Sequence, residues 1–184
     1  LSSAASDVYK RQLVNHALVN AREVLARRLA ESSSQAAIFA RLAELFDLED
    51  TPGRIEVFDN SHISGTNPVG AMIVAGVEGF IRNQYRKFNI RSEDLAPGDD
   101  YAMMREMLTR RFSKLARDKD PANGWAAPDL VLIDGGPGQL SAAIGVLDEL
   151  GLSEIKLAAV AKGPDRNAGR ERIYLKGREP LLLE

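Results

Sequence analysis

Two aspartates stand at the ends of short apolar runs. Asp59 closes the run RIEVFD, and Asp134 closes the run LVLID. Residues at the carboxyl ends of central strands meet in one crevice of an α/β sheet, where ligands usually bind. Two carboxylates about 4 Å apart repel by roughly 4 kcal/mol at an effective dielectric constant near 20, and a divalent cation between them would offset that repulsion. Because oxygen ligands suit Mg²⁺ or Mn²⁺, the pair predicts a site for one of these metals.

Each acidic residue also has a simpler structural interpretation. Either aspartate can cap the turn that follows it, and Asp134 precedes Gly135 and Gly136, which is a common turn sequence. His62 lies three residues beyond Asp59 in DNSH. Its candidate roles are to bind the metal, to orient a water or to contact a phosphate, but a local hydrogen bond is the preferred interpretation.

Phosphate-binding features surround the second aspartate. The turn DGGPGQ opens a predicted helix, and the free N–H groups of a helix N-terminus suit a phosphate. This turn lacks the lysine and the serine or threonine of a nucleotide-binding P-loop, so it is a weak nucleotide signature. The loop from Lys162 to Glu171 carries Lys162, Arg166 and Arg170. We expect it to face the same crevice, where its cations would neutralise phosphates.

A second basic region combines cations with aromatic rings, a mixture that suits contact with a nucleic-acid backbone and base stacking. Its members are Tyr85, Arg86, Tyr101, Arg110, Arg111 and Phe112. Solvated faces of helices and strands are the competing interpretation of these clusters. For Phe112, packing in the core is the favoured role.

Hydrophobic periodicity predicts the elements that must position these side chains. Helical spacing covers residues 13–30, and a second helix begins near Ser34 with Ile38, Leu42 and Leu45 along one side. The later elements, in order, are a strand RIEVFD, a hairpin that turns near Val77 to Gly79, a helix around Asp99 to Arg117, a strand DLVLID, a helix to about Leu150, and strands KLAAVA and RIYLK. This order predicts an α/β fold with a mixed sheet flanked by helices.

Composition limits the classes of protein and of site. The 184 residues are 45% hydrophobic, which suits one ordinary domain, and the absence of cysteine excludes disulfides, zinc–thiolate sites and thiol nucleophiles. The net charge of −2 argues against an overall basic protein, and no run approaches the ~18 apolar residues of a membrane span, so we expect a cytoplasmic protein. We expect residues 1–12 to be a linker artefact, 13–50 a helical lead-in and 54–184 the main domain, with both ends those of a fragment.

Five motifs follow one another along the chain, namely FDNSH, NQYRKFNI, GDDYAMMREMLTRRFSK, DLVLIDGGPGQL and AKGPDRNAGRER. In this order they resemble the UvrC endonucleases of bacterial nucleotide excision repair, particularly those of alphaproteobacteria, and the resemblance covers residues 13–184. It implies an RNase H-like fold that cuts damaged double-stranded DNA 5′ to the lesion, with UvrB as partner and UvrA upstream. It further implies that Asp59 and Asp134 are catalytic metal-binding carboxylates. For Asp100 it implies a functional role, with a structural role as the alternative.

The resemblance also implies that something is missing. The catalytic histidine of the family lies in a later helix resembling RDEAHRF, a motif that this sequence does not contain. We therefore expect the isolated chain to be inactive, and a non-cleaving RNase H-like module that docks DNA or protein is the alternative function. A small-molecule phosphate enzyme built on the DGGPGQ turn is a weaker alternative, because the P-loop lysine is absent.

Overall fold

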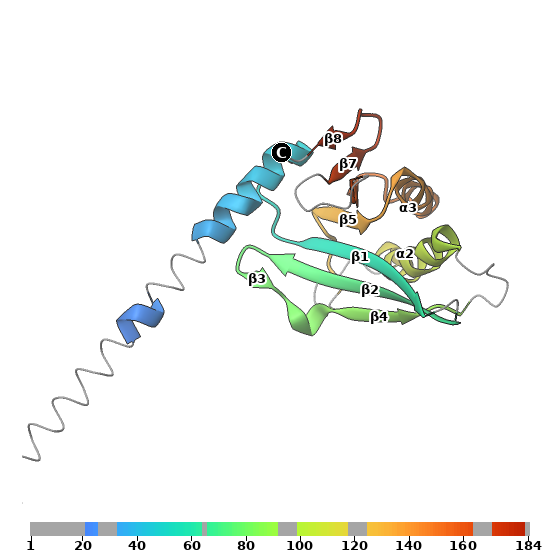
Figure 1. The fold of residues 1–184 in the computed structure, drawn as a ribbon, viewed down its shortest axis with the longest axis horizontal. Helices are drawn as coiled ribbons and strands as arrows, with labels where there is room; N and C mark the ends of the chain where they lie inside the picture. Colours follow the sequence, from blue (N-terminus) through green and yellow to red (C-terminus); the bar gives the residue numbers. More distant parts are fainter. Residues whose placement is uncertain are drawn as a thin grey trace, which may run out of the picture.

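A mixed β-sheet forms the centre of the fold in the computed structural model of the chain (Figure 1). The structure describes residues 21–25, 33–63, 66–91, 99–117, 125–163 and 171–182, without the side chains of residues 62, 63, 66 and 67. Within these ranges the strands are β1 (Ile55–Ile63), β2 (Thr66–Gly76), β3 (Gly79–Phe80), β4 (Arg86–Asn89), β5 (Leu130–Asp134), β6 (Lys156–Ala161), β7 (Arg172–Leu175) and β8 (Leu181–Leu182). The helical residues are 21–25 and 33–46, the 3₁₀ helix η1 (Arg82–Gln84), α2 (Asp100–Arg117) and α3 (Pro137–Glu149).

The strand order is β3-β2-β1-β5-β6-β7-β8, and β4 pairs with β2. β1, β5 and β6 run parallel to one another, because α2 and α3 provide the crossovers between them. β2 pairs antiparallel with both β1 and β4, and β7 pairs antiparallel with β6. This arrangement confirms the predicted mixed sheet, including the hairpin turn after β2 and the buried strand β5.

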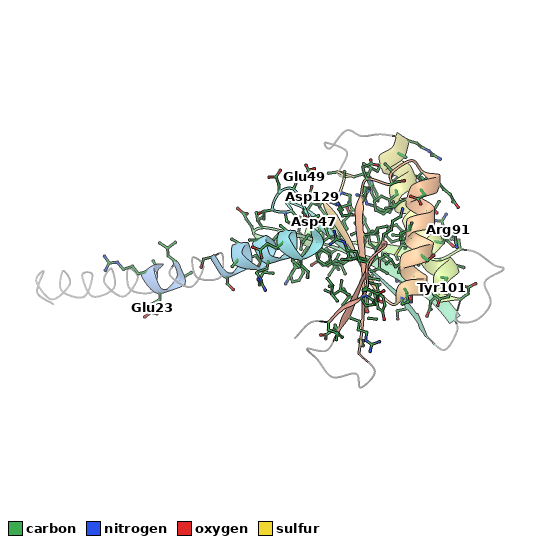
Figure 2. All side chains as sticks on the ribbon, turned by 90° about the horizontal axis from the view of Figure 1, so that it is seen from above. Glu23, Asp47, Glu49, Arg91, Tyr101 and Asp129 are labelled. Atoms are coloured by element: carbon green, nitrogen blue, oxygen red, sulfur yellow. The ribbon has the colours of Figure 1, made fainter. Side chains whose placement is uncertain are left out.

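Two apolar clusters lie on opposite faces of the sheet. α2 and α3 cover one face, where Phe58 of β1 and Ile133 of β5 are almost fully buried. The helix of residues 33–46 covers the other face, next to Ile55 and Leu130 (Figure 2). Successive side chains of a strand point to opposite faces, so this division fixes the direction of each residue in β5 and in β1 as far as Ser61, where the register becomes irregular.

The helix of residues 33–46 differs in one detail from the predicted pattern. Phe39 and Phe46 are 3% and 5% exposed, whereas Ile38, which we expected on the apolar side, is 53% exposed. The two phenylalanine rings have more area to bury, so they turn toward the sheet, and Leu42 and Leu45 stay partly buried beside them. Of the predicted helix over residues 13–30, only residues 21–25 fall within the described residues, and these are helical.

α2 lies close against the sheet. Its buried stripe includes Met103, Met107 and Leu108, as predicted. At Gly70 of β2, a Cβ atom would meet the side chain of Met107, so the absence of a side chain allows this approach. No helix in the described part of the chain is long and apolar enough to cross a membrane.

Candidate active site

Asp59 and Asp134 are neighbours where the parallel pairing of β1 and β5 ends, and Asp134 is the last residue of β5. Asp59 does not end its strand as predicted, because β1 continues to Ile63 by pairing antiparallel with β2. β1 and β5 pair in register up to Phe58 and Ile133, and the two aspartates are the next residues along. Adjacent strands lie about 4.8 Å apart. Ile55 and Leu130 belong to the apolar cluster on the side of the sheet that packs against residues 33–46. Because side chains alternate along a strand, both aspartates point to that same side. The predicted convergence of these two residues is therefore present in the fold.

The surroundings of Asp59 raise its pKa. Partial burial is the largest cause, and the neighbouring charge of Asp134 is the next. The backbone N–H of Asn60 and the charge of Lys162 act in the opposite direction, while Asp100 adds a smaller upward effect. The carboxylates of Asp59, Asp134 and Asp100 and the ammonium group of Lys162 are therefore close enough to interact electrostatically at this edge of the sheet.

Asp100 reaches this place because the start of α2 is fastened to β1. The carboxylate of Asp99 caps the helix by accepting a hydrogen bond from the backbone N–H of Ala102 at 3.0 Å. Asn60 then donates through Nδ2 to the backbone carbonyl of Asp100 at 2.9 Å. The Oδ1 atom of Asn60 is buried and has no hydrogen-bond partner among the residues described. We did not predict this residue, although its position directly after Asp59 is a signal for it.

The glycine-rich turn after Asp134 is held tightly. The backbone N–H of Gly135 donates to the carbonyl of Val160 at 3.0 Å, and that of Gly136 donates to Oε1 of Gln139 at 2.8 Å. A Cβ atom on Gly135 would lie 2.7 Å from the Gln139 side chain. The N-cap position of α3 is occupied by Gly136 and not by Asp134.

The predicted phosphate-binding residues fall into three groups. Lys162 follows β6 immediately and is exposed, and its charge acts on Asp59, so it belongs to the site. Arg166, Arg170 and the side chain of His62 lie outside the described residues. Arg86 and Arg110 lie elsewhere on the molecule: Arg110 follows Asp100 by ten residues, or about 15 Å along α2.

Arg111 is a correction to the sequence-based prediction. Its side chain is fully buried, donating to Glu56 at 2.9 and 2.6 Å and to the carbonyl of Ala126 at 2.7 Å. Arg111 lies on the buried face of α2 next to Phe112, so it cannot contact a phosphate in this fold. Phe112 is also fully buried, as predicted. Arg110 pairs with Glu106 at 3.2 Å and remains partly exposed.

The donor set fits a hard divalent cation. Asp59 and Asp134 supply carboxylate oxygens on one face. Partial burial and then the charge of Asp134 raise the pKa of Asp59, and a cation between the two carboxylates would relieve the repulsion by Asp134. Within the described ranges, no group of three or more histidine, cysteine or acidic residues is arranged to hold a metal ion. The fit therefore rests on the aspartate pair.

Comparison with known sequences identifies the family. Residues 43–184 match the UvrC RNAse H endonuclease domain. The chain belongs to this family. Its relatives include proteins called UvrABC system protein C. That of Rhodopseudomonas palustris is 60% identical over 186 residues, and that of Paramagnetospirillum magneticum is 57% identical over 175 residues. Each match covers 95% of this chain but only 26% and 28% of the relatives, respectively.

The family match and the mixed sheet together confirm the RNase H-like fold that the UvrC motifs implied. Among solved structures, the catalytic domain of human Endonuclease V has a TM-score of 0.43 with 17% identity, covering 77% of this chain and 59% of that one. A likeness this distant carries no argument about function. The family that matches this chain is described as an endonuclease domain.

Replacing Asp59 with asparagine is expected to raise the Tm of the metal-free chain at neutral pH. A raised folded-state pKa means that stability present below the ordinary value of 3.8 is lost as the pH rises through the folded pKa. Asparagine removes the charge that burial and Asp134 oppose, so the gain appears at pH 7 and disappears as the pH falls below the ordinary pKa of 3.8. Thermal unfolding at the two pH values measures it.

The matched control for this experiment is Asp148→Asn, which removes an exposed carboxylate that pairs with Lys176 at 3.6 Å. We expect no gain in Tm from this variant at pH 7. A lower Tm for Asp59→Asn at both pH values would contradict the repulsion that we describe.

Proposed function

We propose that the chain is the metal-dependent endonuclease domain of an excision-repair protein, and that within the whole protein this domain cuts DNA 5′ to a lesion by hydrolysis of a phosphodiester. The observation that carries the proposal is the adjacent placement of Asp59 and Asp134 on one face of the sheet. Membership of the UvrC RNase H endonuclease family supports the endonuclease chemistry. The relatives' name, UvrABC system protein C, supports a place in a DNA-repair pathway.

The residues of the site have separate tasks in this proposal. Asp59 and Asp134 would hold Mg²⁺ or Mn²⁺, which supplies an activated water and charge stabilisation for the leaving oxygen. Lys162 brings a positive charge next to Asp59, where it would stabilise the additional negative charge on the phosphate oxygens. Asp100, fastened through the Asn60 hydrogen bond, would orient groups at the same edge. Arg166, Arg170 and His62 stay candidates from the sequence.

The partners follow from the same proposal. The substrate is damaged double-stranded DNA, and UvrB presents it after UvrA has acted upstream. Because the chain spans little more than a quarter of its relatives, lesion recognition and these contacts are proposed for the whole protein. A module that docks DNA without cutting it is the alternative that the experiment below must exclude.

Binding of Mn²⁺ to the 184-residue chain tests the site, because the free ion can be followed by electron paramagnetic resonance. We expect Asp59→Ala and Asp134→Ala each to weaken Mn²⁺ binding at least about tenfold, the effect of losing roughly 1.4 kcal/mol. Asp148→Ala, on the far end of α3, is the control and should bind as the unchanged chain does.

A nicking assay on lesion-containing plasmid then tests the function. It uses the chain and a full-length UvrC protein with the same aspartates, with and without Mn²⁺. If the two alanine variants bind Mn²⁺ and nick DNA as well as the parent, the assignment of the site is wrong. Metal binding without nicking by the full-length protein would favour the docking module.

A further inference from the structure

Three cationic side chains surround Trp125, the single tryptophan of the chain. Nζ of Lys114 lies 4.1 Å from the centroid of the indole ring, and the guanidinium carbons of Arg111 and Arg86 lie 5.2 and 5.4 Å from it. A cation within about 6 Å of an aromatic face is attracted by the ring quadrupole. We call Arg86, Lys114 and Trp125 the Trp125 patch, with Arg111 buried beneath it.

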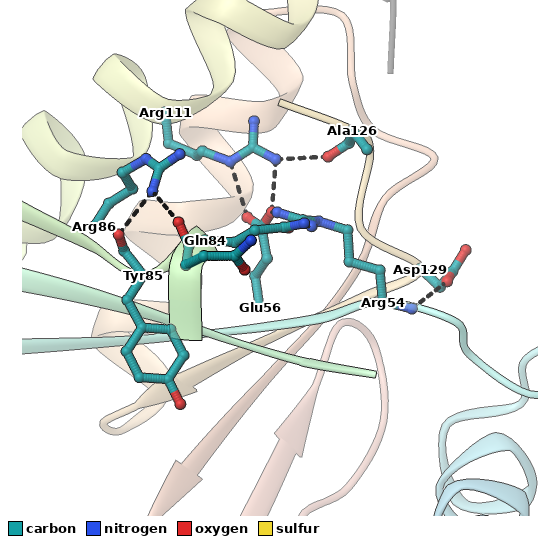
Figure 3. A network of polar contacts seen from close by, with 9 residues as sticks. Arg54, Glu56, Gln84, Tyr85, Arg86, Arg111, Ala126 and Asp129 are labelled. Carbon is teal, nitrogen blue, oxygen red and sulfur yellow. Dashed lines mark hydrogen bonds and ion pairs between the residues drawn. The ribbon is translucent and has the colours of Figure 1, made fainter. Parts of the chain in front are cut away.

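The acidic groups in contact with these cations do not balance their charge. Glu56 is fully buried and accepts hydrogen bonds from both Arg54 and Arg111 (Figure 3). One carboxylate therefore pairs with two guanidinium groups, and the positive charges of Arg86 and Lys114 are additional to these. The nearby Asp129 is engaged by the backbone N–H groups of Gly53 and Arg54, each at 2.8 Å.

Lys114 is the exposed member of the patch, with its ammonium group over the indole ring, and Arg86 is half-buried. Arg86 donates to the backbone carbonyls of Asn83 and Tyr85 at 3.1 and 2.8 Å. Within the described part of the chain, neither side chain has an ion pair with a carboxylate. Unlike Arg111, these two cations are available to an external anion.

We propose that the Trp125 patch is a second contact surface of this chain, separate from the Asp59–Asp134 edge, and that it binds the phosphodiester backbone of duplex DNA. This inference rests on the proposed function for the identity of the polymer. Protein interfaces depend on buried apolar or aromatic anchors. Among the described residues, none of the exposed large hydrophobic side chains is a member of the patch. A surface of long cationic side chains suits phosphates better.

The patch lies toward the end of α2 that is far from Asp100. Lys114 follows Asp100 by fourteen residues of the same helix, a separation of about 21 Å. Successive phosphates of one strand advance about 3.4 Å along the duplex axis, so this separation corresponds to roughly six base pairs. The patch would therefore hold the duplex at a distance from the scissile bond, and it would contribute affinity rather than chemistry.

Trp125 makes the inference directly measurable. Titration of the 184-residue chain with an undamaged duplex of about 20 base pairs, without divalent cation, is expected to change the tryptophan emission and to give a binding constant that falls with salt. Lys114→Ala and Arg86→Ala should each reduce the slope of log K against log salt by about 0.9, the value for one lost phosphate contact. Lys176→Ala is the control, because it removes an equal charge that already pairs with Asp148.

Several results would overturn the inference. They are the absence of duplex binding at low salt, an unchanged emission of Trp125 on binding, and a slope for Lys114→Ala equal to that of the parent. An emission change with polyglutamate at lower concentration than with DNA would instead identify an acidic protein as the partner. Since the titration scores binding and contains no metal, these results leave the Mn²⁺ and nicking experiments unaffected. Nicking that does not depend on Mn²⁺ would contradict the proposed function but not the DNA contact of the Trp125 patch.

Discussion

Replacing Glu56 with glutamine is expected to lower the free energy of unfolding by about 3–5 kcal/mol, the usual cost of removing one partner from a buried ion pair. Glu56 and Arg111 are both 0% exposed, and their closest atoms are 2.6 Å apart. Glutamine keeps the shape of the side chain but leaves the Arg111 guanidinium buried without a counter-charge. The Nη1 atom of Arg111 already has no hydrogen-bond partner among the described residues, so the cluster has little capacity to compensate.

Chemical denaturation measures this loss of stability, and two further variants test whether the buried charge causes it. Glu44→Gln breaks the exposed pair with Arg41, whose side chains are 71% and 84% exposed, and should change stability by less than about 1 kcal/mol. The double variant Glu56→Gln, Arg111→Met removes both charges and should be more stable than Glu56→Gln alone. A loss below about 1 kcal/mol for Glu56→Gln would show that Glu56 is not buried as described.

The sequence predicts the framework of the fold because the framework depends on periodicity. The run LVLID and the stripe of Met103, Met107 and Leu108 each have the spacing of the element that they form, and the structure contains both. The adjacency of Asp59 and Asp134 follows from the sequence in part, since the helical crossovers make β1 and β5 parallel. Asp134 ends β5 as predicted, whereas Asp59 lies within β1, which continues to Ile63. The roles of the two residues remain a proposal.

Other features depend on tertiary contacts that a linear pattern does not contain. Arg111 belongs to a basic run, which suggests a solvated face, but the helix phase turns it toward Glu56. A signal was present, because strand alternation places Glu56 on the same buried face as Phe58. No local pattern indicates that Trp125 meets Lys114 and Arg86, since these residues lie in separate segments.

The second large effect concerns the chemistry at the sheet edge. Replacing Asp134 with asparagine in a full-length UvrC protein is expected to reduce the rate of DNA incision by about 10²–10³-fold. Loss of one preorganised electrostatic group costs roughly 3–4 kcal/mol of transition-state stabilisation. Asparagine keeps the shape and one oxygen, so the fold should be unchanged. Asp148→Asn is the control, because its carboxylate pairs with Lys176 away from the site.

A cysteine at the same position separates loss of the metal from loss of the fold. The chain contains no cysteine, so Asp134→Cys introduces one thiolate, which prefers a soft cation such as Cd²⁺. We expect this variant to bind Cd²⁺ with a thiolate charge-transfer absorption in the ultraviolet, and we expect the added substitution Asp59→Ala to weaken that binding. The dependence on Asp59 is the decisive part, because a lone surface thiolate would bind Cd²⁺ regardless of its neighbour. Equal Cd²⁺ binding with and without Asp59 would mean that the two residues do not share an ion, and the proposed metal site would have to be abandoned even if incision by Asp134→Asn were slow.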